Sequence, residues 1–256
     1  MIPVTFIAAI AAFPSVVNSV ATGFKSALER RGFDCGKPAD GLTQDDCEYM
    51  SSIGMAGQGV NAKSPAPNIN IWIGDQGPSK LIFTNAGSEP VIVIVWDFPK
   101  GDYQASFMNA RRPKVSFSLP KHGDSVSVSM GNGVSGGWSA LVNRKTRLSA
   151  NGQIDNTWGE FTSGEHATVD ISRLINMSGS HMVARTKGGC TTGMDKCVFL
   201  CKAGNTCWEA GSYILDKCGP GSQPGANYGV LNGNPEGGCQ GWENGGHVNV
   251  ELGKPA

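Results

Sequence analysis

Two acidic residues, Glu160 and Asp170, have the types and spacing in this sequence that most directly suggest chemistry. Each lies in a short segment that alternates apolar and polar residues, which predicts two neighbouring strands. Because side chains alternate between the two faces of a strand, burying Phe161 together with Val169 and Ile171 requires Phe161 to face Val169. The same register places Glu160 opposite Asp170 on the other face, about 5 Å away. Two carboxyl groups that close bind a cation or act as an acid–base pair, unless they are simply solvated on an exposed face.

Three further residues complete the predicted ligand-binding set. Trp158 lies on the same face as Glu160, and its indole could stack on a sugar ring. Arg144 and Arg147 could place a positive charge beside the carboxylates and so offset their mutual repulsion. We therefore predict a concave, partly exposed cleft, in which Glu160 and Asp170 are also the candidates for catalysis.

The elements that must position this pair are predicted to be β-strands. Short runs rich in β-branched residues, separated by glycine and proline, fill residues 68–184. Residues 91–96 are apolar throughout, which predicts a strand buried on both faces, and residues 124–130 alternate valine with serine. We expect an all-β fold, an antiparallel β-sandwich of roughly ten strands.

Composition sets limits on the class of protein. The chain has 256 residues, and its 21 lysines and arginines balance its 21 aspartates and glutamates. Apolar residues make up 39% of the sequence, which is enough for a substantial core. No basic run is interleaved with aromatic residues, so we do not expect nucleic acid as the partner.

The first 21 residues predict a secretory signal peptide. Residues 2–13 are apolar, and Ser19-Val20-Ala21 supplies the small residues typical of a cleavage site. No later run approaches the roughly 18 apolar residues that a membrane-spanning helix needs. We therefore expect a secreted, extracellular protein without a membrane span, and we expect a monomer.

After the signal peptide, the chain is expected to divide into three parts. Residues 22–66 are polar and rich in glycine, which predicts an irregular N-terminal arm. Residues 67–186 should hold the β-sandwich core, and residues 187–256 should form a cysteine-rich lobe. Within the arm, the dibasic pair Arg30-Arg31 could be a processing site that releases Gly32 as the first residue, or it could be an ordinary charged helix end.

Eight cysteines support the extracellular prediction. The complete set is Cys35, Cys47, Cys190, Cys197, Cys201, Cys207, Cys218 and Cys239. An even number after a signal peptide predicts a disulfide framework, in which we expect Cys35 to pair with Cys47 and leave the other pairings open. The last six lie among glycine and proline, so we expect them to staple a loop-rich lobe with little core of its own. A zinc site is the alternative, although the sequence holds no Cys-x-x-Cys pair.

Other motifs predict one modification and no cofactor. Asn176-Met177-Ser178 is an N-glycosylation acceptor just after a predicted strand. The four histidines are scattered, with no pair four residues apart, so we expect neither a metal site nor a cofactor.

Several short motifs follow one another in a recognisable order along residues 69–201. They are Phe83-Thr84-Asn85, Pro90-Val91-Ile92-Val93, His122-Gly123-Asp124-Ser125, Gly136-Gly137-Trp138, Gly159-Glu160-Phe161-Thr162, Val169-Asp170-Ile171-Ser172 and Gly189-Cys190. This order resembles the thaumatin-like family in a reduced fungal form. The chain has fewer cysteines than that family, and residues 143–156 stand where the family has a cysteine-rich insertion.

The resemblance implies a β-sandwich with an acidic cleft built from an arginine, a glutamate and several aspartates. Glu160 and Asp170 match those positions, and Arg144, Arg147 and Asp155 are the candidates for the others. The overall pattern also resembles secreted effector-type proteins of plant-associated fungi, which act in virulence.

Three classes of function follow from these observations. The expected one is a non-enzymatic secreted effector or defence-modulating protein that binds an extracellular partner through loops on a rigid sandwich. The second is a binder of cell-wall β-glucan, or a weak endo-β-glucanase, that uses the acidic cleft. The third is a protease inhibitor that presents a disulfide-held loop from residues 190–239.

Overall fold

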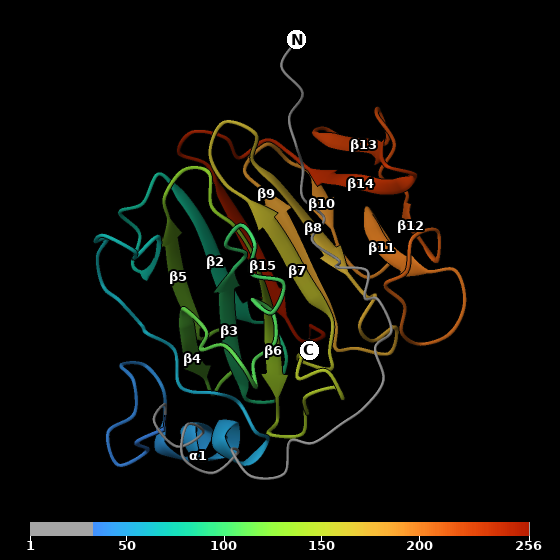
Figure 1. Cartoon of the computed structure of the whole chain (residues 1–256). Coiled ribbons are helices and arrows are strands. Elements are labelled where there is room, and N and C mark those ends of the chain that lie inside the picture. The colour runs from blue at the N-terminus through green and yellow to red at the C-terminus, as the bar shows by residue number, and fades with distance from the viewer. Residues whose placement is uncertain (1–32, 256) are drawn as a thin grey trace.

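The computed structural model of the chain describes residues 33–255. The predicted signal peptide, the first part of the predicted arm and the Arg30-Arg31 pair lie outside the described residues. Two β-sheets stack face to face, and strands account for nearly all of the regular structure (Figure 1). The predicted all-β sandwich is therefore confirmed.

The two sheets have six and nine strands. In spatial order, the six-stranded sheet consists of β1 (Ile71–Ile73), β5 (Ser125–Met130), β2 (Ser79–Asn85), β15 (His247–Leu252), β9 (Met182–Thr186) and β10 (Thr191–Thr192). The nine-stranded sheet runs β12 (Tyr213–Asp216), β11 (Val198–Cys201), β8 (Thr168–Ser172), β7 (Trp158–Thr162), β6 (Ser135–Val142), β3 (Val91–Asp97) and β4 (Val115–Leu119), and the hairpin β13 (Ala226–Leu231)–β14 (Asn234–Cys239) joins it beside β8. Most pairs are antiparallel as predicted, but β15 pairs with β2, and β11 with β8, in parallel. Both parallel pairs join segments far apart in the sequence, which strand patterns alone could not align.

Strand β3 is buried on both of its faces, as its uninterrupted apolar sequence predicted. Val91, Val93 and Val95 belong to the core between the two sheets, whereas Ile92 and Ile94 belong to a second core on the outer face of the nine-stranded sheet. The fold therefore needs a third layer to cover that outer face.

The third layer consists of helix α1 (Gln44–Ser52) and the long loops 98–114 and 143–157. Thr43 begins the helix, because its side chain accepts a hydrogen bond from the backbone N–H of Asp46. Met50 of α1 then packs in the second core with Met108 and Ile154 from the loops, at one end of the sandwich (Figure 1). The arm that was predicted to be irregular thus holds a helix, whose nine residues are too few to show a clear helical period. Within the described residues, no helix has the length and apolar character needed to cross a membrane.

The C-terminal segment does not form a separate lobe beginning at residue 187. Strand β15 lies in the middle of the six-stranded sheet, between β2 and β9, with Val248, Val250 and Leu252 buried. Strands β11 and β12 likewise extend the nine-stranded sheet beyond β8. The alternation of buried and polar residues in 247–252 is an ordinary strand pattern, but sequence alone does not show that it returns to the first sheet.

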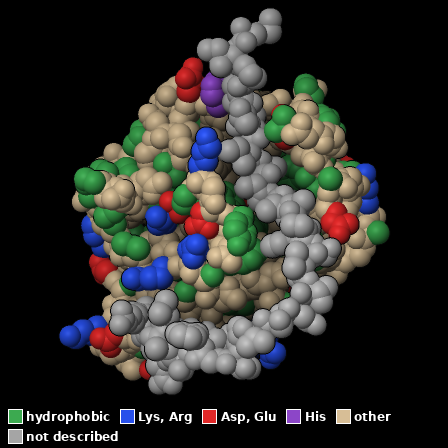
Figure 2. Space-filling model, in the orientation of Figure 1, with side chains coloured by type: hydrophobic (Ala, Val, Ile, Leu, Met, Phe, Trp, Pro, Cys, Tyr) green, Lys and Arg blue, Asp and Glu red, His purple; other side chains and the backbone are tan. Residues whose placement is uncertain are grey.

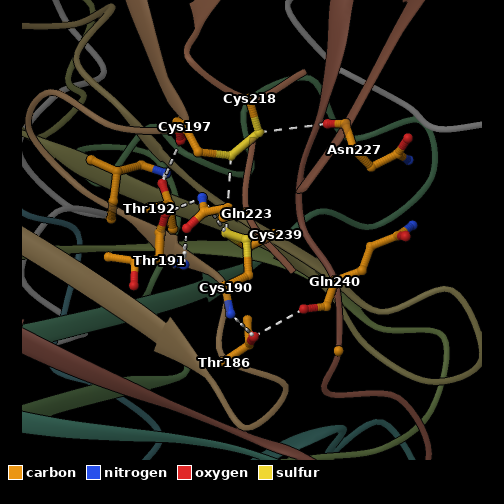
Figure 3. Close-up of a disulfide and its surroundings, with 12 residues drawn as sticks. Thr186, Cys190, Thr191, Thr192, Cys197, Cys218, Gln223, Asn227, Cys239 and Gln240 are labelled. Atoms are coloured by element: carbon orange, nitrogen blue, oxygen red, sulfur yellow. Dashed lines mark hydrogen bonds between the residues drawn. A yellow bond between two sulfur atoms is a disulfide. The ribbon is translucent and has the colours of Figure 1, made fainter. Parts of the chain in front are cut away.

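Four disulfides link the eight cysteines, and the predicted Cys35–Cys47 bridge is among them. The others are Cys190–Cys239, Cys197–Cys218 and Cys201–Cys207. Figure 3 shows two of these bridges side by side, with the Sγ atoms of Cys197 and Cys239 3.9 Å apart. These clustered sulfurs are all bridged, so they offer no thiolate to a metal.

Removing β15 tests how far the C-terminal segment belongs to the sandwich. A chain that ends at residue 246 should lose its cooperative thermal transition, because it lacks the three buried side chains of β15 and leaves β2 and β9 without their shared partner. The burial of each lost side chain contributes about 1.5–3 kcal/mol, against a total stability of about 5–15 kcal/mol. The control is a chain that ends at Gly253, after the strand, which should melt like the full chain. Thermal melting followed by circular dichroism measures both, and equal melting of the two truncated chains would contradict the assignment.

Candidate functional site

The register of the β7–β8 pair is the one predicted from the sequence. Phe161 lies opposite Val169 and faces the core between the sheets. Glu160 lies opposite Asp170, and both carboxyl groups therefore point to the outer face of the nine-stranded sheet. The sheet brings the two predicted acids together.

Two glycines let large rings pack around this pair. Gly159 separates Trp158 from Glu160, and the indole of Trp138 lies on its inner side, where an added Cβ would be 2.0 Å from that ring. Gly137 lies opposite Glu160 on β6, and a Cβ there would be 2.8 Å from the indole of Trp96. A side chain at either position would displace a buried tryptophan and distort the strand that carries Glu160.

Two adjoining cavities form a groove over the pair, and both include Glu160, Phe98 and Leu174 in their walls. The first cavity is also lined by Ser135, Gly136, Phe161, Thr162, Thr168, Asp170, Phe199, Tyr213, Pro235, Glu236 and Gly237. The second is also lined by Tyr103, Ser106, Phe107, Asn151, Gln153, Trp158, Ser172, Ile175, Cys207 and Trp208. Glu160 thus lies where the two cavities meet. We call the two cavities together the groove.

The acids in the groove have no basic partner among the described residues. No lysine or arginine lines either cavity, and none of the ion pairs within residues 33–255 involves Glu160 or Asp170. Elsewhere on the surface, basic and acidic side chains are interspersed on the face shown in Figure 2. The one-sided charge is therefore a local property of the groove.

Asp170 is the more deeply buried of the two acids. Its residue surface is only 8% exposed, and its Oδ1 atom has no hydrogen-bond partner within residues 33–255. A buried carboxyl oxygen without a donor costs about 1–3 kcal/mol or more, so the atom is a strong acceptor for any donor that enters the groove.

Burial makes both acids hold their protons more tightly. It raises the pKa of Glu160 to about 7, although the Ser172 hydroxyl acts in the opposite direction. Burial also raises the pKa of Asp170 well above its usual range, and the negative charge of Glu160 adds to this effect. The pKa of Tyr213, across the first cavity, is raised by burial and by Glu160 as well. In mildly acidic solution the pair is therefore mostly neutral.

The two predicted arginines lie away from the pair. The guanidinium of Arg144 donates from Nε to Asp46 at 2.7 Å and contacts Asp45 at 3.3 Å, both on α1. Arg147 lines a different cavity, beside Tyr49 of the same helix. The connection between β6 and β7 turns toward α1, so its basic side chains help to attach the helix and do not offset the charge of the acids.

Asp155, the remaining candidate from the resemblance, also lies outside the walls of the groove. Its carboxylate accepts a hydrogen bond from the side chain of Asn176 at 3.0 Å. The acidic cleft implied by the resemblance therefore has its glutamate and one aspartate in place, and its arginine candidates elsewhere.

Trp158 is a core residue with little ring surface left for stacking. Its residue surface is 5% exposed, its Nε1 donates to the carbonyl oxygen of Ile154 at 2.8 Å, and its ring packs edge-on against Trp96. Strand alternation correctly assigns Trp158 to the same face as Glu160, but it does not show that the loop around Ile154 covers that face.

Two other aromatic residues are better placed for contact with a ligand. Trp208 is 42% exposed and Tyr103 is 58% exposed, and both line the second cavity. Trp208 is one of six tryptophans in the sequence that could stack on a sugar ring, and it follows Cys207 directly; Trp158 is the stronger candidate from the sequence only because it shares the face of Glu160. No feature of the sequence distinguishes Tyr103 from the other tyrosines.

The disulfide next to Trp208 fixes this wall of the groove. The Cys201–Cys207 bridge closes the loop that leads to Trp208. The backbone N–H of Cys207 donates to the carbonyl oxygen of Leu174 at 2.9 Å, and the Thr206 hydroxyl donates to that of Ile175 at 3.0 Å. The bridged loop is thus attached to the chain just after β8, the strand that carries Asp170.

The raised pKa values predict how stability depends on pH. Between the ordinary glutamate pKa and about 7, the folded chain binds more protons than the unfolded chain, so the free energy of unfolding should fall as pH rises through this range. We expect a loss on the order of 1–3 kcal/mol, reduced by the partial exposure of Glu160. Glu160→Gln should reduce this slope, and the part that comes from the buried Asp170 should remain.

The measurement is urea unfolding at a series of pH values. Glu165→Gln is the matched control, because Glu165 is an exposed acid in the loop between the same two strands. This control should keep the slope of the unaltered chain. A Glu160→Gln chain with an unchanged slope would contradict the pKa assignment.

Comparison with known proteins identifies a family for most of this fold. No curated protein matches the sequence. A family model, the Allergen Asp f 4-like domain, matches residues 80–226, which is more than half of the chain and includes both Glu160 and Asp170. This family is not described as thaumatin-like, so that resemblance and the effector-type subclass stay predictions. The chain belongs to the Allergen Asp f 4-like domain family.

Proposed function

We propose that this chain is an extracellular protein that binds a wall polysaccharide in the groove without cleaving it. The observation that carries this proposal is the buried carboxyl group of Asp170. Its Oδ1 has no hydrogen-bond partner within residues 33–255, and Asp170 lines a groove that also has aromatic side chains in its walls. The ligand that best satisfies such a site brings hydrogen-bond donors and apolar ring faces together.

A sugar chain has both of these features. Its hydroxyl groups can donate to Asp170 and Glu160, and the hydrophobic faces of its rings can stack on Trp208. The second cavity adds the amide of Gln153, which already donates to the Ser106 hydroxyl at 3.2 Å. Because the two cavities adjoin at Glu160, the groove suits an extended ligand such as a β-glucan chain.

The charge state of the pair favours binding over hydrolysis. A glycosidase needs one protonated carboxyl beside one ionised carboxylate that acts as nucleophile or base. In mildly acidic solution the raised pKa values keep both acids protonated, and no lysine or arginine among the described residues lines the groove to keep either one ionised. We therefore propose a non-enzymatic protein, and Glu160 and Asp170 are assigned to binding.

An extracellular location and an effector-type role belong to the same proposal. The four disulfides support secretion, because such bridges persist in oxidising compartments. Occupying a wall polymer is an activity through which a secreted protein of this kind could modify recognition by a host. We do not propose protease inhibition, because the loop closed by Cys201–Cys207 contributes Cys207 to the groove, and Trp208 follows it there.

Replacing the exposed tryptophan tests the proposal. Trp208→Ala should weaken binding of soluble β-glucan oligosaccharides about fivefold, since one aromatic stacking contact contributes about 1 kcal/mol. Tyr228→Ala is the matched control, because Tyr228 is also 42% exposed but lies on β13, outside both cavities. Isothermal titration calorimetry measures the affinities, and a reducing-sugar assay on the same samples should show no cleavage.

One result would contradict binding in the groove, and another would contradict the absence of cleavage. Binding that is equally insensitive to both substitutions would place the sugar outside the groove. Release of reducing ends that disappears in a Glu160→Gln chain would show that the pair is catalytic.

Asn176 is the residue proposed to carry an N-linked glycan. Its Oδ1 accepts a hydrogen bond from the backbone N–H of Ser178 at 2.8 Å, a compact turn on an exposed segment beside Ile175 of the groove. Intact-mass measurement of the chain secreted from a eukaryotic host should show one glycan. Asn176→Gln and Ser178→Ala should each abolish it, the second without touching the acceptor asparagine, and an unmodified parent chain would contradict the assignment.

A further inference from the structure

We propose that the groove prefers a sugar polymer that carries primary ammonium groups, such as a deacetylated amino-sugar chain, over a neutral polysaccharide. This inference rests on the proposed polysaccharide binding and names the class of sugar. Its basis is the combination of an acid-only groove with a buried carboxyl oxygen that lacks a donor.

Among residues 33–255, the charged groups that face the groove are all acidic. Glu160 comes from β7, Asp170 from β8 and Glu236 from β14. The other titratable groups are the phenols of Tyr213 from β12 and Tyr103 from loop 98–114, while β6 contributes only serine and glycine. No lysine or arginine from the described part of the chain lines either cavity and competes for the three carboxyl groups.

The state of Asp170 shows that this cluster is more than a group of solvated acids. The residue is more than nine-tenths buried, with 8% of its surface exposed, and its Oδ1 has no hydrogen-bond partner in the described part of the chain. Asp170 also lines the first cavity, so its carboxyl group lies at the wall of a space that a ligand can enter. If these acids were only solvated, their oxygens would bind water, and none would be buried without a hydrogen-bond partner.

An ammonium group satisfies such a site better than a hydroxyl does. It brings three N–H donors together with a full positive charge, and hydrogen bonds between ionised partners are roughly twice as strong as neutral ones. An acetylated amino sugar has the same ring but replaces this charge by a neutral amide. Comparing the two sugars therefore isolates the contribution of the charge.

Binding of an ammonium should also release protons from the groove. In the free protein burial raises the pKa of Glu160 and of Asp170, so both carboxyl groups hold protons in mild acid. A cation beside them favours the ionised form, and the released protons pass to the buffer. At about pH 5.5 a primary amine is already charged, so the sugar takes up no compensating protons.

The experiment is calorimetric titration of the full chain at about pH 5.5 with oligomers of equal length of glucosamine, N-acetylglucosamine and β-linked glucose. The glucosamine oligomer should bind at least about tenfold more tightly than the other two, and less so at high salt. Repeating the titration in buffers of different ionisation heat measures the released protons, which should appear only with glucosamine.

Two variants locate the effect. Glu160→Gln keeps the size of the side chain but removes its charge, so it should lower the affinity for the glucosamine oligomer more than the affinities for the two neutral oligomers. Glu165→Gln, at an exposed acid outside both cavities, should leave the preference unchanged.

The outcomes separate this inference from the function on which it rests. Equal affinity for glucosamine and glucose oligomers would overturn the preference and leave polysaccharide binding intact. Failure of every oligomer to bind would overturn both. A lysine oligopeptide that binds as tightly as the glucosamine oligomer would show that the groove responds to charge alone, and would overturn the assignment to a sugar.

Discussion

The candidate site depends on the burial of Phe161, Val169 and Ile171 between the two sheets. Each such side chain contributes about 1.5–3 kcal/mol when it leaves water, and a slip of one residue in the β7–β8 register would expose the set. This register necessarily places Glu160 beside Asp170. Holding two carboxyl groups together is costly, but protonation reduces their repulsion, and the apolar contribution is large enough to outweigh what remains.

The disulfides extend this constraint to the walls of the groove. The stretch from Lys202 to Gly246 contains several exposed apolar side chains and few buried ones, so burial alone would hold its loops weakly. The bridge Cys201–Cys207 attaches this stretch to the end of β11, and Cys190–Cys239 attaches it to the turn between β9 and β10. Strand β14 then brings Glu236 to the first cavity. The disulfides thus hold in place the loops that line the groove, whereas apolar burial holds the β7–β8 pair that carries the two acids.

The sequence predicts the parts of this structure that follow from local alternation. The β-sandwich, the doubly buried β3, the opposition of Glu160 and Asp170 and the Cys35–Cys47 bridge all follow from residue patterns or short separations. Alternation assigns a residue to a face, but it does not show which distant loop covers that face. For that reason the burial of Trp158 and the pairing of Arg144 with Asp46 of α1, 98 residues away, could not be predicted. The parallel pairing of β15 with β2 is equally non-local.

The fold itself does not require acids at positions 160 and 170. Elsewhere on the outer face of the same sheet, Ile92 and Ile94 are apolar and covered by the third layer. If the third layer left Glu160 and Asp170 open to water, solvation would explain why these positions are acidic. Asp170, however, is only 8% exposed, and its Oδ1 has no hydrogen-bond donor within residues 33–255. A buried, unmatched acid lowers stability wherever it is ionised, and strongly perturbed acids gather at functional sites more often than elsewhere. The groove therefore has the properties of a surface shaped for a ligand that supplies the missing donor.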